Sequence, residues 1–559
     1  MASLRHEAVS DKTVTPSLAA PFRLFMSRCY DDGMQPLLRR LERAGVSRRE
    51  FCAHAVALAA VPTLGCAASA RGKIRFPRDP FTMGVASGDP DASGFVIWTR
   101  LAPEPFADGG GMEPAAVDVG WEVASDDAMR DVVARGVTAA TPQLGHSVHV
   151  EVDGLPSDRW FFYRFRAGDA ESPVGRARTL PGPGDDRARV DFAVTTCQNW
   201  EQGLWTAYEQ MLRDEPDLVF HLGDYIYEYE AGRNGKVRTH HGGEIQSLED
   251  YRRRYAQYRS DPLLQAMHAK CPWFVTWDDH EFDNNCAASV SEQSGVDPRA
   301  FLARRQNAYQ AYYEAMPLRR SSLPRGPHLQ LYRKASFGQL AEFFVLDGRQ
   351  YRTDQPNNDR RSPINEAALD PRQSMLGAEQ RAWLKQGLIS SAARWNVLAQ
   401  QVMMGMVGVP SGDDPTPRYS MDQWPGYARE RMQLVQFLED RRVPNPVVLT
   451  GDIHSNWCNE LRVDDRRHDA PVVAAEFVAT SLSSGGNGYD RPRHHDAMLA
   501  GNPCVKFHNR QRGYLRCSVT QATWTTDYVV MDQVEVAGGA ASTRARLVLE
   551  AGSATVHSG

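Results

Sequence analysis

The stretch that decides the fold is Asp217-Leu218-Val219-Phe220-His221-Leu222-Gly223-Asp224-Tyr225-Ile226-Tyr227. It begins as a short apolar run and turns at a Gly-Asp pair. A continuous apolar run of this length, bounded by glycine, is typical of a strand buried on both faces. The sequence therefore places the carboxylate of Asp224 and the phenol of Tyr227 just beyond the carboxyl end of a buried strand.

Three other apolar runs end in polar groups in the same way. Residues 188–195 lead into Thr196-Cys197-Gln198-Asn199, residues 272–276 into Trp277-Asp278-Asp279-His280-Glu281-Phe282-Asp283-Asn284-Asn285, and residues 446–449 into Thr450-Gly451-Asp452-Ile453-His454-Ser455-Asn456. In a layered α/β sheet the carboxyl ends of such strands lie along one edge, where ligand sites form. The four strand ends together predict one site.

The spacing of apolar residues between these runs predicts helices at 202–213 and 248–258, with further strands at 340–346 and 395–403. Strands that alternate with helices indicate an α/β (α+β) layered core. The core is expected within a catalytic domain at 188–540. The tail from 528 to 556 returns to short strands, and residues 541–559 are expected to form a C-terminal tail.

The region before this core has a different periodicity. Residues 94–99, 117–123, 146–152 and 160–165 alternate apolar and polar side chains, with Gly, Pro and Asp between the runs. Several short period-two strands predict a small all-β sandwich of immunoglobulin-like or fibronectin-like type, here at 76–181. Residues 181–186, rich in Pro, Gly and Asp, predict a linker to the next domain.

The ligand types at the strand ends indicate metal chemistry. Carboxylates and imidazoles gathered beside an apolar sheet repel one another unless positive charge compensates them. Asp, Asn and His suit divalent ions, whereas the phenolate of Tyr227 and the thiolate of Cys197 suit ferric iron. Such ions would grip phosphoryl oxygens and lower the pKa of a bound water. Each residue alone is more often structural, so the prediction depends on all four strand ends agreeing.

The N-terminal residues 1–70 have the form of an export leader. Arg48-Arg49 precedes a short apolar stretch at 52–61, and Ala68-Ser69-Ala70 has the small-x-small form of a cleavage site. A paired arginine before a modest apolar stretch is typical of a twin-arginine signal, read by the twin-arginine export machinery. Met34 is an alternative start, and Cys66 an alternative lipid anchor. We expect a periplasmic, secreted or cell-envelope-associated protein.

Composition narrows the class of function. The 559-residue chain has a net charge of −5 and a pI near 6.4, so no nucleic-acid-binding surface is indicated. No stretch is long and apolar enough to predict a transmembrane helix. The six cysteines beyond the leader show no C-x-x-C spacing, and neither a G-x-S-x-G elbow nor a P-loop occurs.

At these strand ends the sequence resembles the PhoD family of alkaline phosphatases and phosphodiesterases, within the calcineurin-like metallophosphoesterases. The resemblance spans about Phe81 to Glu535. It is carried by residues 81–90, 220–228, 277–281, 422–427, 451–455 and 480–486. The resemblance implies a metallophosphoesterase β-sandwich flanked by helices. Residues 346–352 also resemble a family segment, with Gly348 where Thr is usual, and Gln355-Pro356-Asn357 lacks an expected Cys; both departures bear on substrate preference.

The resemblance also implies roles. Cys197, Asp224 and Tyr227 would bind a ferric ion (Fe3+), and Asp224 would bridge to calcium (Ca2+), with Mn2+, Mg2+ or Zn2+ as alternative divalent ions. His280 would bind phosphate or protonate the leaving group, and Asp279 would take part in catalysis or metal binding. The remaining metal ligands implied by the family are Asn285, Asp422, Asp452 and His454.

Three functions follow as hypotheses. The first is an exported metal-dependent phosphomonoesterase or phosphodiesterase acting on small phosphate esters. The second is a phospholipase D-type hydrolase of phospholipid head groups, which an apolar patch beside the site would favour, whereas Arg or Lys there would favour small anionic esters. The third is a non-catalytic cell-surface binding protein, against which the intact ligand set argues.

Overall fold

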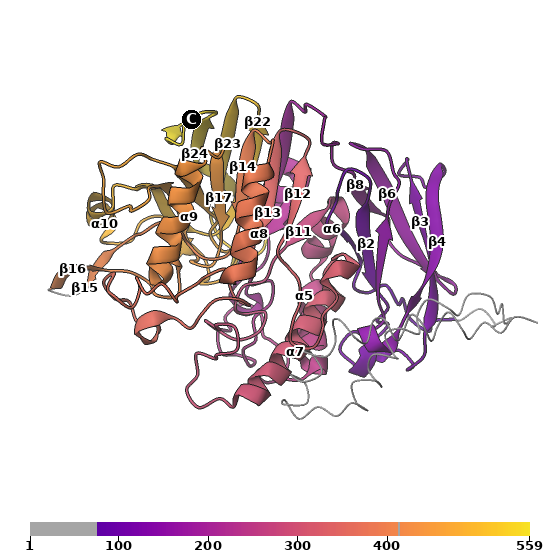
Figure 1. The fold of residues 1–559 in the computed structure, drawn as a ribbon. Coiled ribbons are helices and arrows are strands. Elements are labelled where there is room, and N and C mark those ends of the chain that lie inside the picture. Colours follow the sequence, from indigo (N-terminus) through magenta and orange to yellow (C-terminus); the bar gives the residue numbers. More distant parts are fainter. Residues whose placement is uncertain (1–74, 412–413) are drawn as a thin grey trace, which may run out of the picture. The chain divides into compact units, whose positions relative to one another are not determined.

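The strand expected after Asp217 is β10 (Leu218–His221), which runs parallel between β9 (Arg189–Thr195) and β11 (Trp273–Val275). The computed structural model describes residues 75–411 and 414–559. These three strands form the middle of a ten-stranded sheet (Figure 1). The other strands are β22 (Gly513–Thr520), β23 (Thr523–Met531), β24 (Ala541–Glu550) and β25 (His557–Ser558) beyond β9, and β1 (Val85–Gly88), β2 (Phe95–Arg100) and β5 (Ser147–Val152) beyond β11.

A second sheet has eight strands, and its central strands β13, β14, β17 and β19 are parallel. In spatial order it contains β12 (Arg333–Phe337), β13 (Ala341–Val345), β14 (Trp395–Ala399), β17 (Pro446–Thr450), β19 (Ala474–Val478), β18 (Asn456–Leu461), β21 (Val505–Gln511) and β20 (Gly488–Tyr489). Every residue of β13, β14, β17 and β19 is buried, which explains why most of their residues are apolar.

The two sheets face each other across one apolar core. Phe192 of β9 and Phe220 of β10 meet Phe343 of β13, with ring centroids 5.5 and 4.8 Å apart. Helices cover the outer faces (Figure 1). On the ten-stranded sheet these are α4 (Ala207–Asp214), α5 (Leu248–Arg259), α6 (Pro262–Lys270) and α7 (Pro298–Ala315); on the eight-stranded sheet, α8 (Gly377–Ser390) and α9 (Ala428–Asp440). The described chain is therefore a mixed α/β protein, as the alternation predicted.

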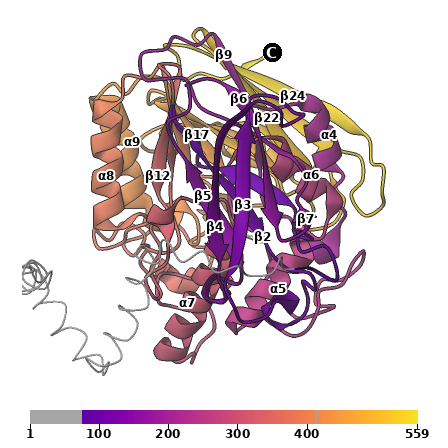
Figure 2. The ribbon, with the colours of Figure 1, turned by 90° about the vertical axis from the view of Figure 1, so that its right-hand side faces the viewer.

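The N-terminal strands form a further sheet beside β2 and β5 (Figure 2). It contains β3 (Val117–Ala124), β4 (Val132–Ala140), β6 (Trp160–Ala167), β7 (Ala170–Glu171) and β8 (Gly175–Arg178). Phe95 and Ile97 of β2 share a core with Phe161 and Phe165 of β6. However, β1 pairs in parallel with β11, so the ten-stranded sheet contains strands from both sides of the predicted linker.

The structure differs from the sequence predictions at three places. The helix expected at 202–213 begins later, because Gly203 has extended backbone after a short 3-10 turn at Trp200–Gln202, and α4 starts at Ala207. The tail contains long strands, since β23 and β24 span nine and ten residues. The four chemically active strand ends belong to two sheets, because β17 lies in the eight-stranded one.

The remaining sequence predictions concern the leader, the cysteines and membrane-spanning helices. The predicted leader, with Arg48-Arg49, Met34 and Cys66, lies outside the described residues. The six cysteines that the structure describes are all buried free thiols. None of the helices in the described ranges combines the length and the apolar character that a bilayer crossing requires.

Candidate metal centre

The loops after β9, β10, β11 and β17 converge at one place. Face-to-face packing brings the carboxyl end of β17 beside those of β9, β10 and β11, so two sheets supply the edge that one was expected to supply. Potential ligand atoms form three groups, each within 4.8 Å of one another: Cys197 with Asp224 and His454; Asp224 with Asp279 and His280; and Asp278 with Asp279 and Asp452.

The first group contains the residues predicted to suit ferric iron. The Tyr227 hydroxyl donates to Asp224 Oδ2 at 2.8 Å and lies 3.2 Å from His454 Nε2. Asp224 Oδ2 is 3.9 Å from the same His454 nitrogen. The other oxygen, Asp224 Oδ1, is buried and has no hydrogen-bond partner among the described residues. An orphaned buried carboxylate oxygen next to thiol, phenol and imidazole fits a cation.

The third group is acidic and is crossed by one guanidinium. Arg349 is fully buried and contacts Asp278 through Nε, Asp452 at 3.1 Å and Asp279 at 3.4 Å. Asp278 Oδ2 and Asp279 Oδ1 have no hydrogen-bond partner among the described residues. One guanidinium cannot neutralise three carboxylates, so this group also fits an additional cation.

Asp422 lies beside the acidic group of Asp278, Asp279 and Asp452, and its carboxylate already accepts several hydrogen bonds. It accepts two bonds of 3.0 Å from Arg349 Nη1, one of 2.7 Å from Arg352 and one of 2.9 Å from Gln355. Asn285 is also near, because its backbone amide donates to Asp279 Oδ2 at 2.7 Å. Its side-chain amide donates to Asp359 Oδ2 at 2.7 Å. Both predicted ligands thus adjoin the centre through other side chains.

His280 is oriented by an acidic neighbour and an aromatic ring. Its Nδ1 lies 2.8 Å from Glu228 Oε2, and its ring packs on Tyr227 with centroids 4.2 Å apart. Burial alone would lower the pKa of His280, but the carboxylates of Glu228, Asp224 and Asp279 outweigh burial and raise the pKa well above its ordinary value. These carboxylates therefore favour the protonated ring, and Nε2 is the nitrogen not engaged by Glu228.

The aspartates of the centre differ in acidity. Burial raises the pKa of Asp452 to about 7, because neighbouring carboxylates add to burial and Arg349 only partly offsets them. The pKa of Asp278 is also raised, first by burial and then by Asp279. Burial would raise the pKa of Asp279 as well, but Arg349 and His280 overcome it and depress that pKa. A bound cation would favour the charged form of all three.

Glu281 ties two of the loops together. Its carboxylate accepts hydrogen bonds from the backbone amides of Asp224 at 3.0 Å and Asp278 at 2.8 Å, and from that of Tyr225. Burial raises the pKa of Glu281 to about 8, and the charge of Asp224 adds to that effect. Because Glu281 holds the loop after β10 against the loop after β11, it sets the spacing between Asp224 and Asp278.

All nine residues predicted for the site lie in this connected set, and sequence reasoning missed several others. Asp278 and Glu281 lie in the loop after β11, and the sequence alone indicated no role in the site for either residue. Arg349 and Arg352 belong to segment 346–352, which resembles a family segment. The sequence therefore marked their positions, but nothing in it indicated that they would pair with the aspartates of the site. Ser484, which hydrogen-bonds the Tyr227 hydroxyl at 2.6 Å, belongs to the quoted segment 480–486.

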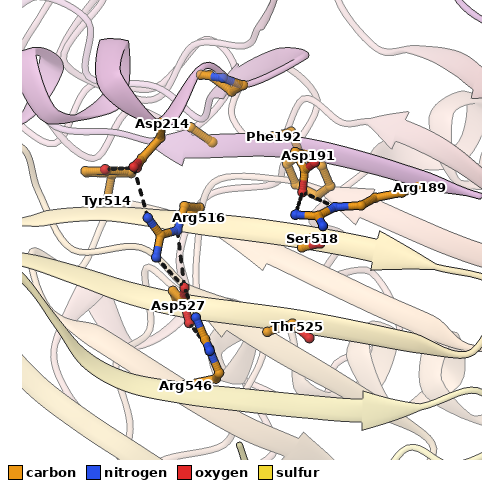
Figure 3. Close-up of a pocket in the computed structure, with 12 residues that line it drawn as sticks. Arg189, Asp191, Phe192, Asp214, Tyr514, Arg516, Ser518, Thr525, Asp527 and Arg546 are labelled. Carbon is orange, nitrogen blue, oxygen red and sulfur yellow. Dashed lines mark hydrogen bonds and ion pairs between the residues drawn. The ribbon is translucent and has the colours of Figure 1, made fainter.

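A different hollow, of about 440 Å³, lies on β9, β22, β23 and β24 of the ten-stranded sheet (Figure 3). Its three arginines and three aspartates pair among themselves. Arg516 contacts Asp214 at 2.9 Å and Asp527 at 2.6 Å, and Arg546 contacts Asp527 at 2.6 Å. These charges are mutually satisfied, so the hollow offers no chemistry comparable to the strand-end centre.

Comparisons with family models, with a related protein and with a solved structure all indicate the same family. A family model described as PhoD-like phosphatase matches residues 192–528, and one described as PhoD-like phosphatase, N-terminal domain, matches residues 65–181. The chain is 50% identical over 479 residues to alkaline phosphatase D of Bacillus subtilis (strain 168), which covers 85% of this chain and 82% of that relative. A solved structure described as "Structure of PhoD" matches with a TM-score of 0.83 and 50% identity, covering 85% of this chain and 91% of that one. The chain belongs to the PhoD-like phosphatase family.

Proposed function

We propose that the protein is an exported, metal-dependent alkaline phosphatase and phosphodiesterase that hydrolyses phosphate esters. The observation that carries the proposal is the convergence of four strand-end loops, which gathers Cys197, Asp224 and His454 beside Asp279 and His280. Similarity to alkaline phosphatase D of Bacillus subtilis supports the class of reaction.

The proposed metals follow from the donor sets. Cys197, Asp224 and Tyr227 offer soft and hard anionic donors and, with the imidazole of His454, would hold Fe3+, whereas Asp279 and Asp452, with Asn285 and Asp422 beside them, would hold Ca2+ or another divalent ion. When bound, the cations supply positive charge for phosphoryl oxygens and lower the pKa of a coordinated water. The buried oxygens Asp224 Oδ1 and Asp278 Oδ2, which have no hydrogen-bond partner among the described residues, support this assignment.

His280 is the proposed proton donor to the leaving oxygen. Glu228 accepts from Nδ1, so the second ring nitrogen can donate outward. The carboxylate of Glu228 raises the pKa of His280 and so supports a role as proton donor. Packing on Tyr227 fixes the plane of the ring, so the proton is delivered at a defined position beside the acidic groups.

The finer assignments of the fold and of export belong to the same proposal. Residues 76–181 would form an immunoglobulin-like domain, supported by the shared core of β2, β5 and β6. Residues 188–540 would form the catalytic β-sandwich, supported by the core between the two large sheets; the expected tail at 541–559 instead contributes β24, whose Leu547 and Leu549 lie in that core. Residues 1–70 would carry the twin-arginine signal, with Cys66 as an alternative anchor, and would direct the protein to the periplasm, exterior or envelope.

Metal analysis and hydrolysis assays of the purified protein test the proposal. We expect bound iron and calcium, hydrolysis of a nitrophenyl phosphate monoester and of the corresponding diester, and loss of activity on chelation. Phosphatidylcholine tests the phospholipase D-type alternative. Turnover of phosphatidylcholine with neither nitrophenyl ester hydrolysed would favour that alternative, and metal without any turnover would favour the binding protein.

Asp224→Ala is the decisive variant, because Asp224 belongs to two of the three ligand groups. It should abolish turnover and lower the iron content while the far-ultraviolet circular dichroism stays unchanged. Asp185→Ala is a matched control, because Asp185 is an exposed residue between the two domains matched by the family models. Full activity of the Asp224 variant would exclude the assigned centre.

A further inference from the structure

A pocket of about 350 Å³ shares a wall with the metal centre. Gln423 lines the pocket and also donates to Asp452 Oδ2 at 3.2 Å. Ile453 lines it as well, and it stands in the chain between Asp452 and His454. A group held at the metal centre through its phosphorus would therefore have this pocket directly beside it.

The inner wall of the pocket is apolar and firmly built. Met403, Val407 and Trp457 are 3%, 6% and 8% exposed and belong to one buried cluster, against which Ile453 packs. The Trp457 ring is fixed from two sides, because its Nε1 donates to Ser455 Oγ at 2.8 Å and the ring packs on His508 at 3.9 Å. The cavity is thus preformed, which lowers the ordering cost of binding an apolar group.

The charged side chains of the pocket have one sign. Arg361 and Arg418 line it, and no carboxylate does so among the residues that the structure describes. Arg418 is partly neutralised by Asp414 at 3.1 Å, and Arg361 Nη2 donates to the Arg418 carbonyl at 3.2 Å. The pocket therefore combines an apolar floor with two arginines, which favour an anionic group over a cationic one.

We propose that this pocket is a subsite for the alcohol arm of the ester, selecting arms that have a compact apolar body and an anionic end. The inference rests on the proposed function, since the ester phosphorus is taken to lie at the metal centre. The volume is at the lower end of the range for small-molecule pockets, so it holds one ring or a short chain rather than two acyl chains. The arginines disfavour a quaternary ammonium head group.

Three benzyl phosphates with matched bodies test this selectivity: unsubstituted, para-carboxy and para-trimethylammonio. We expect kcat/KM to be about tenfold higher for the carboxylated ester than for the cationic one, which corresponds to about 1.4 kcal/mol of electrostatic preference. Arg361→Gln should reduce that ratio by about threefold or more, because an exposed charge contributes modestly. Arg372→Gln is the control, since Arg372 is an exposed arginine outside the pocket that pairs with Asp370 at 2.6 Å.

Binding of the matching benzylphosphonates, which cannot be hydrolysed, is measured by calorimetry on the metal-loaded protein. The same order of affinity supports the subsite even if no ester is turned over, in which case only the proposed function fails. Equal or reversed preference for the anionic and cationic phosphonates overturns the subsite, whatever the activity. The subsite is also overturned if Arg361→Gln leaves the preference for the anionic over the cationic ligand unchanged. The same holds if Arg372→Gln reduces that preference as much as Arg361→Gln does.

Discussion

The residues that would hold metal adopt a backbone conformation that few side chains favour. Cys197, Asp224, Asp452 and His454 all have positive φ, at 56°, 54°, 64° and 53°. Left-handed backbone at residues other than glycine costs free energy and persists only where the surroundings enforce it. Here neighbouring loops do so, because the amide of Cys197 donates to the Gly223 carbonyl at 3.1 Å. Strained backbone at four candidate ligands is consistent with a functional site.

Gly223 permits the closest approach of two loops, and its replacement provides a test. A Cβ at this position, where φ is +108°, would lie 2.4 Å from the Cβ of Asp278. We expect Gly223→Ala to cost about 1–3 kcal/mol from backbone strain alone and to lower the metal content. Gly243→Ala, which meets no atom within 4 Å, should change the unfolding free energy by less than about 0.5 kcal/mol. Equal behaviour of the two variants would contradict this role.

Arg349 provides a second test at the residue scale. It contacts Asp278, Asp279, Asp422 and Asp452, so its removal leaves buried carboxylates uncompensated. Arg349→Met should lower the unfolding free energy in chelator by about 3–5 kcal/mol, and added calcium should restore part of the loss. Urea denaturation with and without calcium measures both effects. Arg349→Lys keeps the charge but not the planar guanidinium, so its free energy of unfolding should lie between those of the wild type and Arg349→Met. An unchanged free energy of unfolding in Arg349→Met would refute the electrostatic account.

At the scale of elements, buried ion pairs attach helices to the loops around the sheets. Arg431 of α9 is fully buried, and its Nη2 donates to Asp465 Oδ2 at 2.6 Å. Asp465 also accepts from the backbone amides of Met406 and Arg462 at 2.8 and 2.7 Å. This one carboxylate therefore joins α9, the loop after β14 and the loop after β18.

Adjacent aspartates allow a matched comparison of a buried and an exposed pair. Asp465→Ala should lower the unfolding free energy by about 3–5 kcal/mol, because Arg431 would remain buried without its partner. Asp464→Ala removes bonds from the more exposed Arg466 alone, from Nη2 at 2.7 Å, Nε at 2.8 Å and the backbone amide at 3.1 Å, and should cost about 1 kcal/mol. Urea denaturation followed by tryptophan fluorescence measures both. A similar loss in the two variants would argue against α9 being held by this pair.

At the scale of the whole molecule, the last strands complete the ten-stranded sheet. The β22 strand pairs with β9, whose end carries Cys197, and β23 and β24 extend the sheet outward. Leu547 and Leu549 of β24 are 6% and 1% exposed and lie in the core between the two sheets. The C-terminal residues are therefore structurally continuous with the strand that leads into the metal centre.

Truncation tests how much this continuity contributes. A chain ending at Ala540 loses β24, exposes the edge of β23 and removes two buried leucines, each of which contributes about 2–5 kcal/mol. We expect that chain to aggregate, with a much lower soluble yield. A chain ending at Val556 loses only the short exposed strand β25 and Gly559 and should keep its thermal midpoint. Equal soluble yields would show that 541–559 is a dispensable tail.

The sequence by itself determined the alternation of buried strands and helices, and the polar groups at each strand end. Both are local properties: an apolar run bounded by glycine predicts a buried strand, and the residues after it must leave the sheet. It also predicted that Cys197, Asp224 and His454 would lie together, because parallel strands present their carboxyl ends at a common edge.

Only the tertiary structure decided which sheet holds each strand and what lies between the acidic groups. Sheet membership depends on pairing between distant segments, such as β22 with β9, which no local pattern specifies. The placement of Arg349 among four aspartates depends on side chains from three loops meeting in space. The pocket beside Asp452 arises in the same way, since its walls come from separate segments whose packing alone creates the cavity.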